Sequence, residues 1–525
     1  MTSRERRLGL ALLLVAASAA ALCALALRRD DSANAIHAMA PKRAVFSEAL
    51  AREFQKFRDA EAIEEPEARC LAYPDLQEFS WDPKVVKAFC HLWARQMITW
   101  SAINEALDKH NPELLQQTFD TYLERTYKRG QHGFLTWAFS WTFQNDAPET
   151  LQTATKWVDE DPQSGYARAA RGMHYVAAAY SARGGEFVRD TPSEKLDRMH
   201  DFADKAKSDL EESLRLNPRV IAAYHGLLRI AQLTGDDELR KSSVKQALAL
   251  DPADQWVYDD WMDAVEPKWG GSMQEMQRVA DASASHAGSN PLLSRARGRP
   301  LCYVAQQTTC EQCEPADHLK VLEMYRESAA FGPSACFLKG AGEAAENAGE
   351  LDAALRYYSQ GIRLLGNDDL RVRRADLLHR FGRTDLALED FGKAVARNPR
   401  NTYALDHQAY ILELSGRAGE AEQSYLAILQ ADPKNERAAL QLSRLYLSKL
   451  ASPDKAEPLI AALLERNPKL ARAWLYKAAL AKGKDEAACR EGLENYLKYV
   501  DRNNVYERQD IAQAQARLDQ LKHKT

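Results

Sequence analysis

Four cysteines gather in the middle of the chain at a spacing that several kinds of chemistry can use. Cys302 is followed by Cys310, Cys313 and Cys336. Four thiolates with one close pair could hold a zinc ion in tetrahedral geometry. In an oxidising compartment the same residues would form two disulfides, and free or redox-active thiols are a third alternative. The Cys-x-x-Cys lacks the strand-then-helix context of a thioredoxin-type site, which argues against redox-active thiols. Because an oxidising compartment would more often convert the four thiols to two disulfides, we favour disulfides and no metal.

A second pair of cysteines lies near the N-terminus. Cys70 and Cys90 flank a loop-like stretch that contains Pro74 and Pro83. A disulfide between them would remove unfolded-state entropy worth about 3 kcal/mol. Of the 8 cysteines, 7 remain when Cys23 of the N-terminal apolar run is set aside. An odd number leaves one thiol over, and Cys489 in the last predicted hairpin is our candidate.

Other residues that could do chemistry form no recognisable site. The histidines show no metal spacing, and the sequence contains no His-Glu-x-x-His, no phosphate-binding Gly-rich lysine loop and no Gly-x-Ser-x-Gly. The acidic run 159–161 stops just before Pro162 and is interpreted as a solvated helix end. The sequence therefore predicts a protein that is not an enzyme and needs no cofactor.

The N-terminus predicts export. Arg4, Arg6 and Arg7 precede an uncharged apolar run over residues 8–27, which Arg28 and Arg29 end. About 20 apolar residues can span a bilayer, and the preceding charges favour a cytoplasmic N-terminus. Residues 1–35 are thus an inner-membrane anchor or a signal peptide, with a possible cleavage site at 33–35. In both cases we expect the rest of the chain in the periplasm.

The length and charge of the chain limit the expected fold and the kinds of partner. The chain has 525 residues, a charged fraction of 28% and a formal net charge of −5. This length exceeds one compact core, whereas a solenoid has no such limit. A nucleic-acid partner would usually show as a basic stripe, so we expect none.

An Asn-Pro or Asp-Pro dipeptide recurs along the chain. Asp251-Pro252 follows Asn217-Pro218 after 34 residues, and Asn398-Pro399, Asp432-Pro433 and Asn467-Pro468 follow one another after 34 and 35 residues. A period near 34 residues predicts an array of helical hairpins.

The second half of each hairpin carries small and aromatic residues on one helical face. In the unit 335–368 these are Ala354, Tyr358 and Gly361, and the next two units repeat the pattern at Ala387, Phe391 and Ala394 and at Ala421, Tyr425 and Ile428. From about residue 316 onward the chain resembles the tetratricopeptide repeat (TPR) family. The resemblance implies an all-α, right-handed superhelical solenoid of about ten hairpins.

Upstream the rhythm is less regular. Residues 165–183 and 195–216 are predicted helices joined by a long connection over 184–192, and a Trp-Gly-Gly-Ser element spans 269–272 before a capping box of Ser272 and Glu275. Residues 70–293 resemble an uncharacterised family of exported TPR-like proteins from Gram-negative bacteria. That resemblance implies no established activity.

The expected organisation has five parts. Residues 1–35 are the signal or anchor, and residues 36–160 a helical cap, rich in Trp81, Trp93, Trp100, Trp137 and Trp141, with a helix starting behind a capping box of Asp146 and Glu149. Irregular repeats follow over 161–300, a Cys-rich junction and helix over 301–334, and regular repeats over 335–525. We expect the cap to pack its own core against the first repeat.

The concave face of the predicted solenoid is the expected binding surface. Illustrative residues on it are Lys339, Arg371, Arg374, Leu405 and Asp406. Some TPR proteins bind a terminal carboxylate with a Lys and Asn clamp. This clamp is absent from the sequence, because Glu343 stands where the clamp has Asn. Trp256, Trp261 and Trp269 form a possible hot spot, although core packing is the alternative for all three.

We therefore predict a non-catalytic scaffold or assembly factor that binds a protein or peptide in the cell envelope. An inhibitor or immunity-type protein that masks a secreted toxin is one alternative. An envelope enzyme with an unrecognised site in residues 44–300 is another.

Overall fold

The computed structural model describes residues 45–522, except residues 77, 80, 94–96, 129, 187, 309–313 and 367. Within these residues the elements are α-helices and short 3₁₀ helices, without a strand. The chain forms two compact units, a larger one over residues 49–366 and a smaller one that contains residues 45–48 and 368–522. The predicted all-α class is confirmed. The division falls one hairpin later than the predicted boundary at residue 335.

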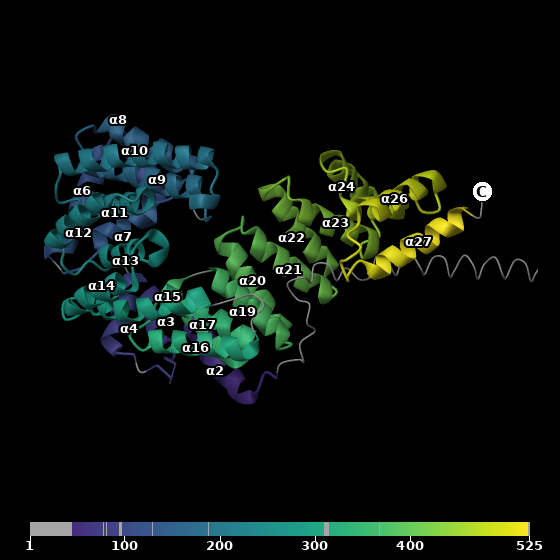
Figure 1. Ribbon diagram of the computed structural model, residues 1–525, viewed down its shortest axis with the longest axis horizontal. Coiled ribbons are helices and arrows are strands. Elements are labelled where there is room, and N and C mark those ends of the chain that lie inside the picture. Colours follow the sequence, from purple (N-terminus) through teal and green to yellow (C-terminus); the bar gives the residue numbers. More distant parts are fainter. Residues whose placement is uncertain are drawn as a thin grey trace, which may run out of the picture. The chain divides into compact units, whose positions relative to one another are not determined.

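The larger unit holds the irregular half of the chain (Figure 1). Its first helices are α2 (Glu48–Glu61), α3 (Pro66–Ala72), α4 (Pro83–Trp93), α5 (Trp100–Asp108), α6 (Pro112–Lys128), α7 (Phe134–Phe143) and α8 (Pro148–Glu160). The hairpins that follow are built from α9 (Gly165–Arg183), α10 (Ser193–Leu216), α11 (Ile221–Thr234), α12 (Asp237–Leu250), α13 (Gln255–Ala264), η3 (Pro267–Trp269), α14 (Met273–Ser285), η4 (Pro291–Gly298), α15 (Arg299–Thr308), α16 (Pro315–Ala329), α17 (Ala335–Ala348) and α18 (Leu351–Leu365). A 3₁₀ turn, η2 (Val188–Asp190), lies in the long connection between α9 and α10.

The recurring Asn-Pro and Asp-Pro dipeptides end helices by a shared mechanism. The Asn217 side chain accepts a hydrogen bond from the backbone N–H of Arg219 at 3.1 Å. Asp251, Asn398, Asp432 and Asn467 each accept in the same way from the residue two positions later. Proline cannot continue the helix, and the Asx side chain satisfies the first N–H of the turn.

Close helix approach explains the small residues of the hairpins. A Cβ atom on Gly342 of α17 would collide with the Tyr358 ring of α18. Tyr358 itself is fully buried, as are Ala354, Ala387 and Phe391 of the predicted pattern. The small and aromatic positions therefore pack between the paired helices of a hairpin.

The cap region divides into two parts. Helices α5–α8 share one hydrophobic core with α9–α11, in which Phe119, Phe139 and Trp157 are fully buried, as expected for a cap on the first repeat. The predicted capping box of Asp146 and Glu149 is wrong, because the N-cap of α8 is Ala147 without a side-chain cap.

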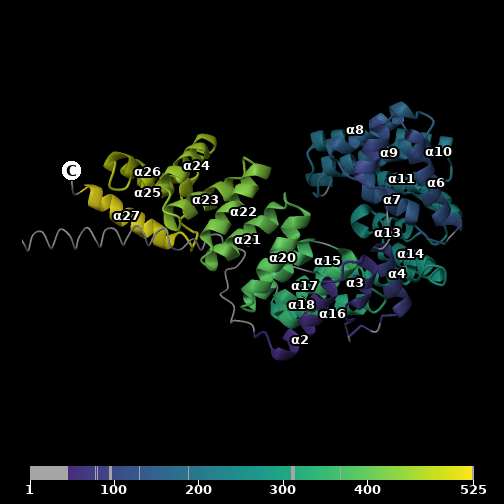
Figure 2. The same cartoon turned by 180° about the vertical axis from the view of Figure 1, so that it is seen from behind.

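Residues 66–93, called the N-terminal arm below, lie elsewhere in the larger unit. Both views show α3 and α4 beside α15–α17, more than 200 residues later in the chain (Figures 1 and 2). The indole N–H of Trp81 donates to the carbonyl of Ala329 at 2.8 Å. The arm therefore joins the beginning of the unit to its end.

The smaller unit contains the regular repeats that follow α17 and α18. Its helices are α19 (Asp368–Arg380), α20 (Thr384–Arg397), α21 (Thr402–Leu414), α22 (Ala418–Ala431), α23 (Glu436–Ser448), α24 (Pro453–Arg466), α25 (Ala471–Ala481), α26 (Glu486–Tyr499) and α27 (Arg508–Lys522). Ion pairs link the first helices of successive hairpins, such as His407 with Asp376 at 2.9 Å and Arg444 with Glu413 at 2.7 Å. The right-handed sense of the superhelix stays a prediction.

In the part of the chain that the structure describes, no helix is both long and apolar enough to cross a bilayer. The predicted anchor over residues 8–27 lies outside the described residues, so the membrane prediction is not tested.

Candidate functional site

Two disulfides hold the larger unit. Cys70 of α3 pairs with Cys90 of α4, with their Cα atoms 5.4 Å apart, and Cys302 of α15 pairs with Cys336 of α17, with a Cα distance of 6.3 Å. Because Cys302 and Cys336 are oxidised together, the alternative of a four-thiolate zinc site is wrong. Cys310 and Cys313 lie outside the described residues. Cys489 is buried in α26 and belongs to neither disulfide.

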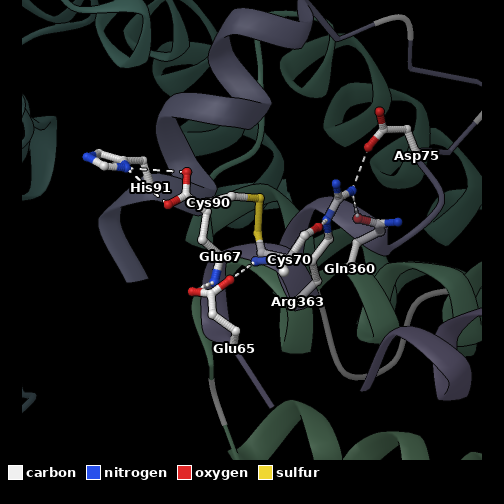
Figure 3. Close-up of a disulfide and its surroundings, with 9 residues drawn as sticks. Glu65, Glu67, Cys70, Asp75, Cys90, His91, Gln360 and Arg363 are labelled. Atoms are coloured by element: carbon white, nitrogen blue, oxygen red, sulfur yellow. Dashed lines mark hydrogen bonds and ion pairs between the residues drawn. A yellow bond between two sulfur atoms is a disulfide. The ribbon is translucent and has the colours of Figure 1, made fainter. Parts of the chain in front are cut away.

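A buried arginine binds the N-terminal arm beside the first disulfide (Figure 3). The Arg363 Nε donates to the carbonyl of Cys70 at 2.6 Å, and its NH1 contacts Asp75 at 2.5 Å. The neighbouring Gln360 donates through Nε2 to the carbonyl of Pro74 at 2.6 Å. Burial lowers the pKa of Arg363, and Asp75 partly offsets this effect. Helix α18 therefore binds one backbone carbonyl in the last turn of α3 and one in the segment that follows it.

Aromatic side chains complete the contact with the arm. The Phe79 ring stacks on Trp81 at 5.7 Å and meets Phe337 of α17 edge-on at 5.1 Å. Both Phe79 and Trp81 are buried. Hydrogen bonds to the carbonyls of Cys70 and Pro74 and the buried rings of Phe79 and Trp81 therefore attach the arm to α16–α18.

A polar cavity of about 340 Å³ lies at the Trp-Gly-Gly-Ser element. Three aromatic residues line it, Tyr180 from α9, Trp269 from η3 and Tyr303 from α15, together with the amides of Gln232 and Gln306. The Tyr180 hydroxyl donates to the Gln232 Oε1 at 2.6 Å. This bond fixes the amide and leaves its Nε2 as the available donor.

Charged residues of opposite sign line the rest of the cavity. Arg299 contacts both Asp263 and Glu266, and Lys268 contacts Glu266 at 2.7 Å. Burial, with the neighbouring acids, outweighs the effect of Arg299 and raises the pKa of Asp263 to about 6. The pKa of Arg299 is also raised, because the carboxylates overcome its own burial. Glu266 is thus shared by Arg299 and Lys268, and a third lining cation, Arg229, pairs with Asp260.

Local contacts explain why Trp, Gly and Ser occupy positions 269, 271 and 272 of the Trp-Gly-Gly-Ser element. Trp269 is partly buried, and the Arg183 guanidinium lies 4.7 Å from its ring centroid. A Cβ on Gly271 would collide with the carbonyl of Val265, and the predicted cap is confirmed because Ser272 accepts from the N–H of Glu275 at 3.2 Å. The element is a tight corner that presents Trp269 to the cavity.

Three polar side chains, from α7, α11 and α13, contact one another in a row inside the larger unit. Ser140 Oγ of α7 lies 3.1 Å from His225 Nε2 of α11, and His225 Nδ1 lies 2.5 Å from Asp260 Oδ2 of α13. Arg229 also binds Asp260 at 3.0 Å, and both partners lower the pKa of Asp260 although burial opposes them.

The order of these groups is that of a Ser-His-Asp triad, but the surroundings differ from a catalytic site. A nucleophilic serine needs backbone N–H donors beside it to bind an oxyanion. Ser140 lies inside α7, whose amides bond within the helix, and His225 is only 4% exposed. We interpret the contacts among Ser140, His225 and Asp260 as structural contacts that hold three helices together. The sequence showed no local motif for them, because the three residues are 85 and 35 residues apart.

A second, more apolar groove of about 500 Å³ lies over the cap helices. Met97, Ile98, Trp100 and Trp141 line it, and Trp141 is 61% exposed. Trp141 is the one tryptophan among the large exposed hydrophobic residues in the described chain. The groove therefore offers an accessible aromatic surface.

The structure separates the residues predicted for the concave face. Lys339 is exposed in the larger unit, whereas the other four lie in the smaller unit. Arg371 and Arg374 are buried against Asp390, the latter at 2.8 Å, and Leu405 is buried. Their burial argues against direct contact with a partner, and the binding role of the concave face stays a prediction.

The remaining predicted residues also differ in environment. Asp406 pairs with Arg437 at 2.8 Å. Trp256 and Trp261 are partly buried, and Trp261 stacks with Tyr258 at 6.2 Å. Of the predicted aromatic hot spot, only Trp269 lines the polar cavity. Within the described residues, no cluster of three or more His, Cys, Asp or Glu could hold a metal ion.

The paired helices, their 34-residue period and the small–aromatic packing define the chain as a TPR-like helical-repeat protein. Solved TPR proteins show distant similarity. A structure of YrrB, a TPR protein with an unusual peptide-binding site, is 20% identical over 37% of this chain and 96% of that chain, with a TM-score of 0.29. Yeast Tom70 is 12% identical over 81% of this chain and 96% of that chain, with a TM-score of 0.34. The Cut9–Hcn1 hetero-tetramer of the APC/C is 12% identical over 91% and 97%, with a TM-score of 0.32.

No protein-family model matches the chain, and no curated protein matches it.

Proposed function

We propose that the chain is a non-catalytic scaffold that binds a protein or peptide partner in the cell envelope. The observation that carries this proposal is the way in which α16–α18 hold the N-terminal arm. Arg363 and Gln360 bind the backbone carbonyls of Cys70 and Pro74, groups that every polypeptide offers. A repeat surface that binds backbone carbonyls of its own chain has the chemistry to bind those of another.

The groove beside Trp141 is the surface we propose for the partner. Aromatic residues are enriched at interface hot spots, and Trp141 exposes 61% of its surface. Met97 and Ile98 extend the apolar lining. We expect an apolar or aromatic side chain of the partner protein to enter this groove.

Two features support the envelope location. The described residues contain two disulfides, which persist mainly in oxidising compartments. The apolar run 8–27 follows three arginines, as in an exported protein. A reporter enzyme that works only outside the cytoplasm, fused after Thr525, should be active. Activity of a cytoplasm-dependent reporter alone would contradict the location.

Quantitative affinity capture from the native envelope tests the scaffold proposal. The wild type should enrich a defined partner, and Trp141→Ser should lose at least half of it. Leu414→Ser is the matched control, because Leu414 is also an exposed apolar residue, at 57%. Equal recovery with all three proteins would contradict the proposed surface. Recovery of a secreted toxin would favour the immunity-type alternative.

A further inference from the structure

The polar cavity at Trp269 has a composition that protein binding does not explain. Its volume of about 340 Å³ falls in the range of small-molecule sites. None of the described lining residues is aliphatic, so the cavity offers no pocket for a hydrophobic anchor of a peptide. The lining instead combines aromatic rings with planar polar groups.

We propose that this cavity binds a neutral carbohydrate, one or two sugar units of an oligosaccharide. A sugar ring has apolar C–H faces that lie against aromatic rings, and hydroxyl groups that both donate and accept hydrogen bonds. Trp269, Tyr180 and Tyr303 supply the rings. The amides of Gln232 and Gln306 can each donate and accept.

The charge of the cavity favours a neutral ligand over an anion. Arg299 and Lys268 are paired with Asp263 and Glu266, and Arg229, which also lines the cavity, is paired with Asp260. A phosphate or carboxylate ligand would have to compete with these acids for each cation. Hydroxyl groups can instead bridge the cations and carboxylates without breaking the pairs.

The cavity is also held in shape before a ligand arrives. The Arg183 guanidinium lies over Trp269, and Arg183 is 8% exposed, so the indole is supported from within the fold. The Tyr180 hydroxyl is bonded to Gln232. The Cys302–Cys336 disulfide ties α15 to α17, and Cys336 forms part of the wall. A rigid site loses little conformational entropy on binding.

Calorimetric titration of the full chain with cellobiose, maltose and N,N′-diacetylchitobiose tests the proposal. At least one sugar should bind saturably with one site per chain. Trp269→Ala should weaken that binding at least tenfold, about 1.4 kcal/mol, while Trp141→Ala, outside this cavity, should leave it within twofold. If Trp269→Ala fails to fold, Gln306→Ala at an exposed lining position should still weaken binding at least threefold.

Three results would overturn the proposal. The first is no saturable binding of any of the three sugars. The second is unchanged affinity in both Trp269→Ala and Gln306→Ala. The third is saturable binding of inorganic phosphate with no binding of sugar, which would identify an anion site instead. None of these results bears on the groove at Trp141, so the scaffold proposal is tested separately.

Discussion

Replacing Arg363 with methionine should loosen the N-terminal arm from α16–α18. The side chain of Arg363 is only 1% exposed, and it bonds the carbonyl of Cys70, Asp75 and the Gln360 Oε1. Methionine keeps most of the apolar stem but removes every donor. The Cys70 carbonyl and the Gln360 oxygen then lose a charged partner.

The magnitude follows from these contacts. A buried acceptor left without its partner costs about 1–3 kcal/mol. The pair with Asp75 adds less than about 1 kcal/mol, because the Asp75 side chain is 49% exposed. Removal of the guanidinium also relieves the burial that lowers its pKa. We therefore expect a net loss of about 2 kcal/mol.

Hydrogen exchange and denaturant unfolding measure this loss. A loss of 2 kcal/mol corresponds to about 30-fold faster exchange of the amides in α3 and α4. Arg215→Met is the matched control, since Arg215 forms a pair with Glu212 while 65% exposed, and it should change stability by less than about 0.5 kcal/mol. The reasoning is refuted if Arg363→Met has no larger effect than Arg215→Met and the arm keeps its protection.

Three further predictions concern the larger unit, and the last of them is compared with a control substitution in the smaller unit. Replacing Cys302 and Cys336 together with serine should lower the unfolding free energy by about 4 kcal/mol, because the closed loop spans 34 residues; a loss below about 1 kcal/mol would contradict the disulfide. Asp263→Asn should change the pH dependence of thermal unfolding. Because burial raises the pKa of Asp263 to about 6, its stabilising contribution is complete below about pH 4 and is lost as the pH rises through 6. The melting temperature of the wild type minus that of the variant should therefore fall over this window, and a constant difference would count against the shift. Gly271→Ala should destabilise by about 2 kcal/mol or more through its clash with the Val265 backbone. Gly392→Ala in α20 meets open space and should stabilise by about 0.5–1 kcal/mol; similar effects of the two changes would contradict the tight corner.

Local chemistry explains why the repeats could be predicted. The side chains of Asn217 and its four counterparts each accept a hydrogen bond from the N–H two residues later. Because this interaction is local, its period is visible in the sequence. The small–aromatic pattern, as at Gly342 and Tyr358, also lies within one hairpin. Such short-range interactions leave a periodic signature.

The site residues depend on long-range contacts, which leave no periodic signature in the sequence. Arg363 acts on a carbonyl 293 residues away, and any residue supplies a carbonyl. The cavity gathers Tyr180, Trp269 and Tyr303 from three elements, of which the sequence singled out only Trp269. Arg371 and Arg374 were expected on the concave face, but a single acid on the paired helix, Asp390, holds both inside the unit.

Site-specific photo-crosslinking in the native host tests the scaffold function most directly. A photoreactive residue in place of Trp141 should give a discrete adduct with one partner protein. The same residue in place of Leu414, an exposed position of the smaller unit, should not give that adduct. Absence of an adduct from position 141, or the same adducts from both positions, would contradict the proposed binding surface.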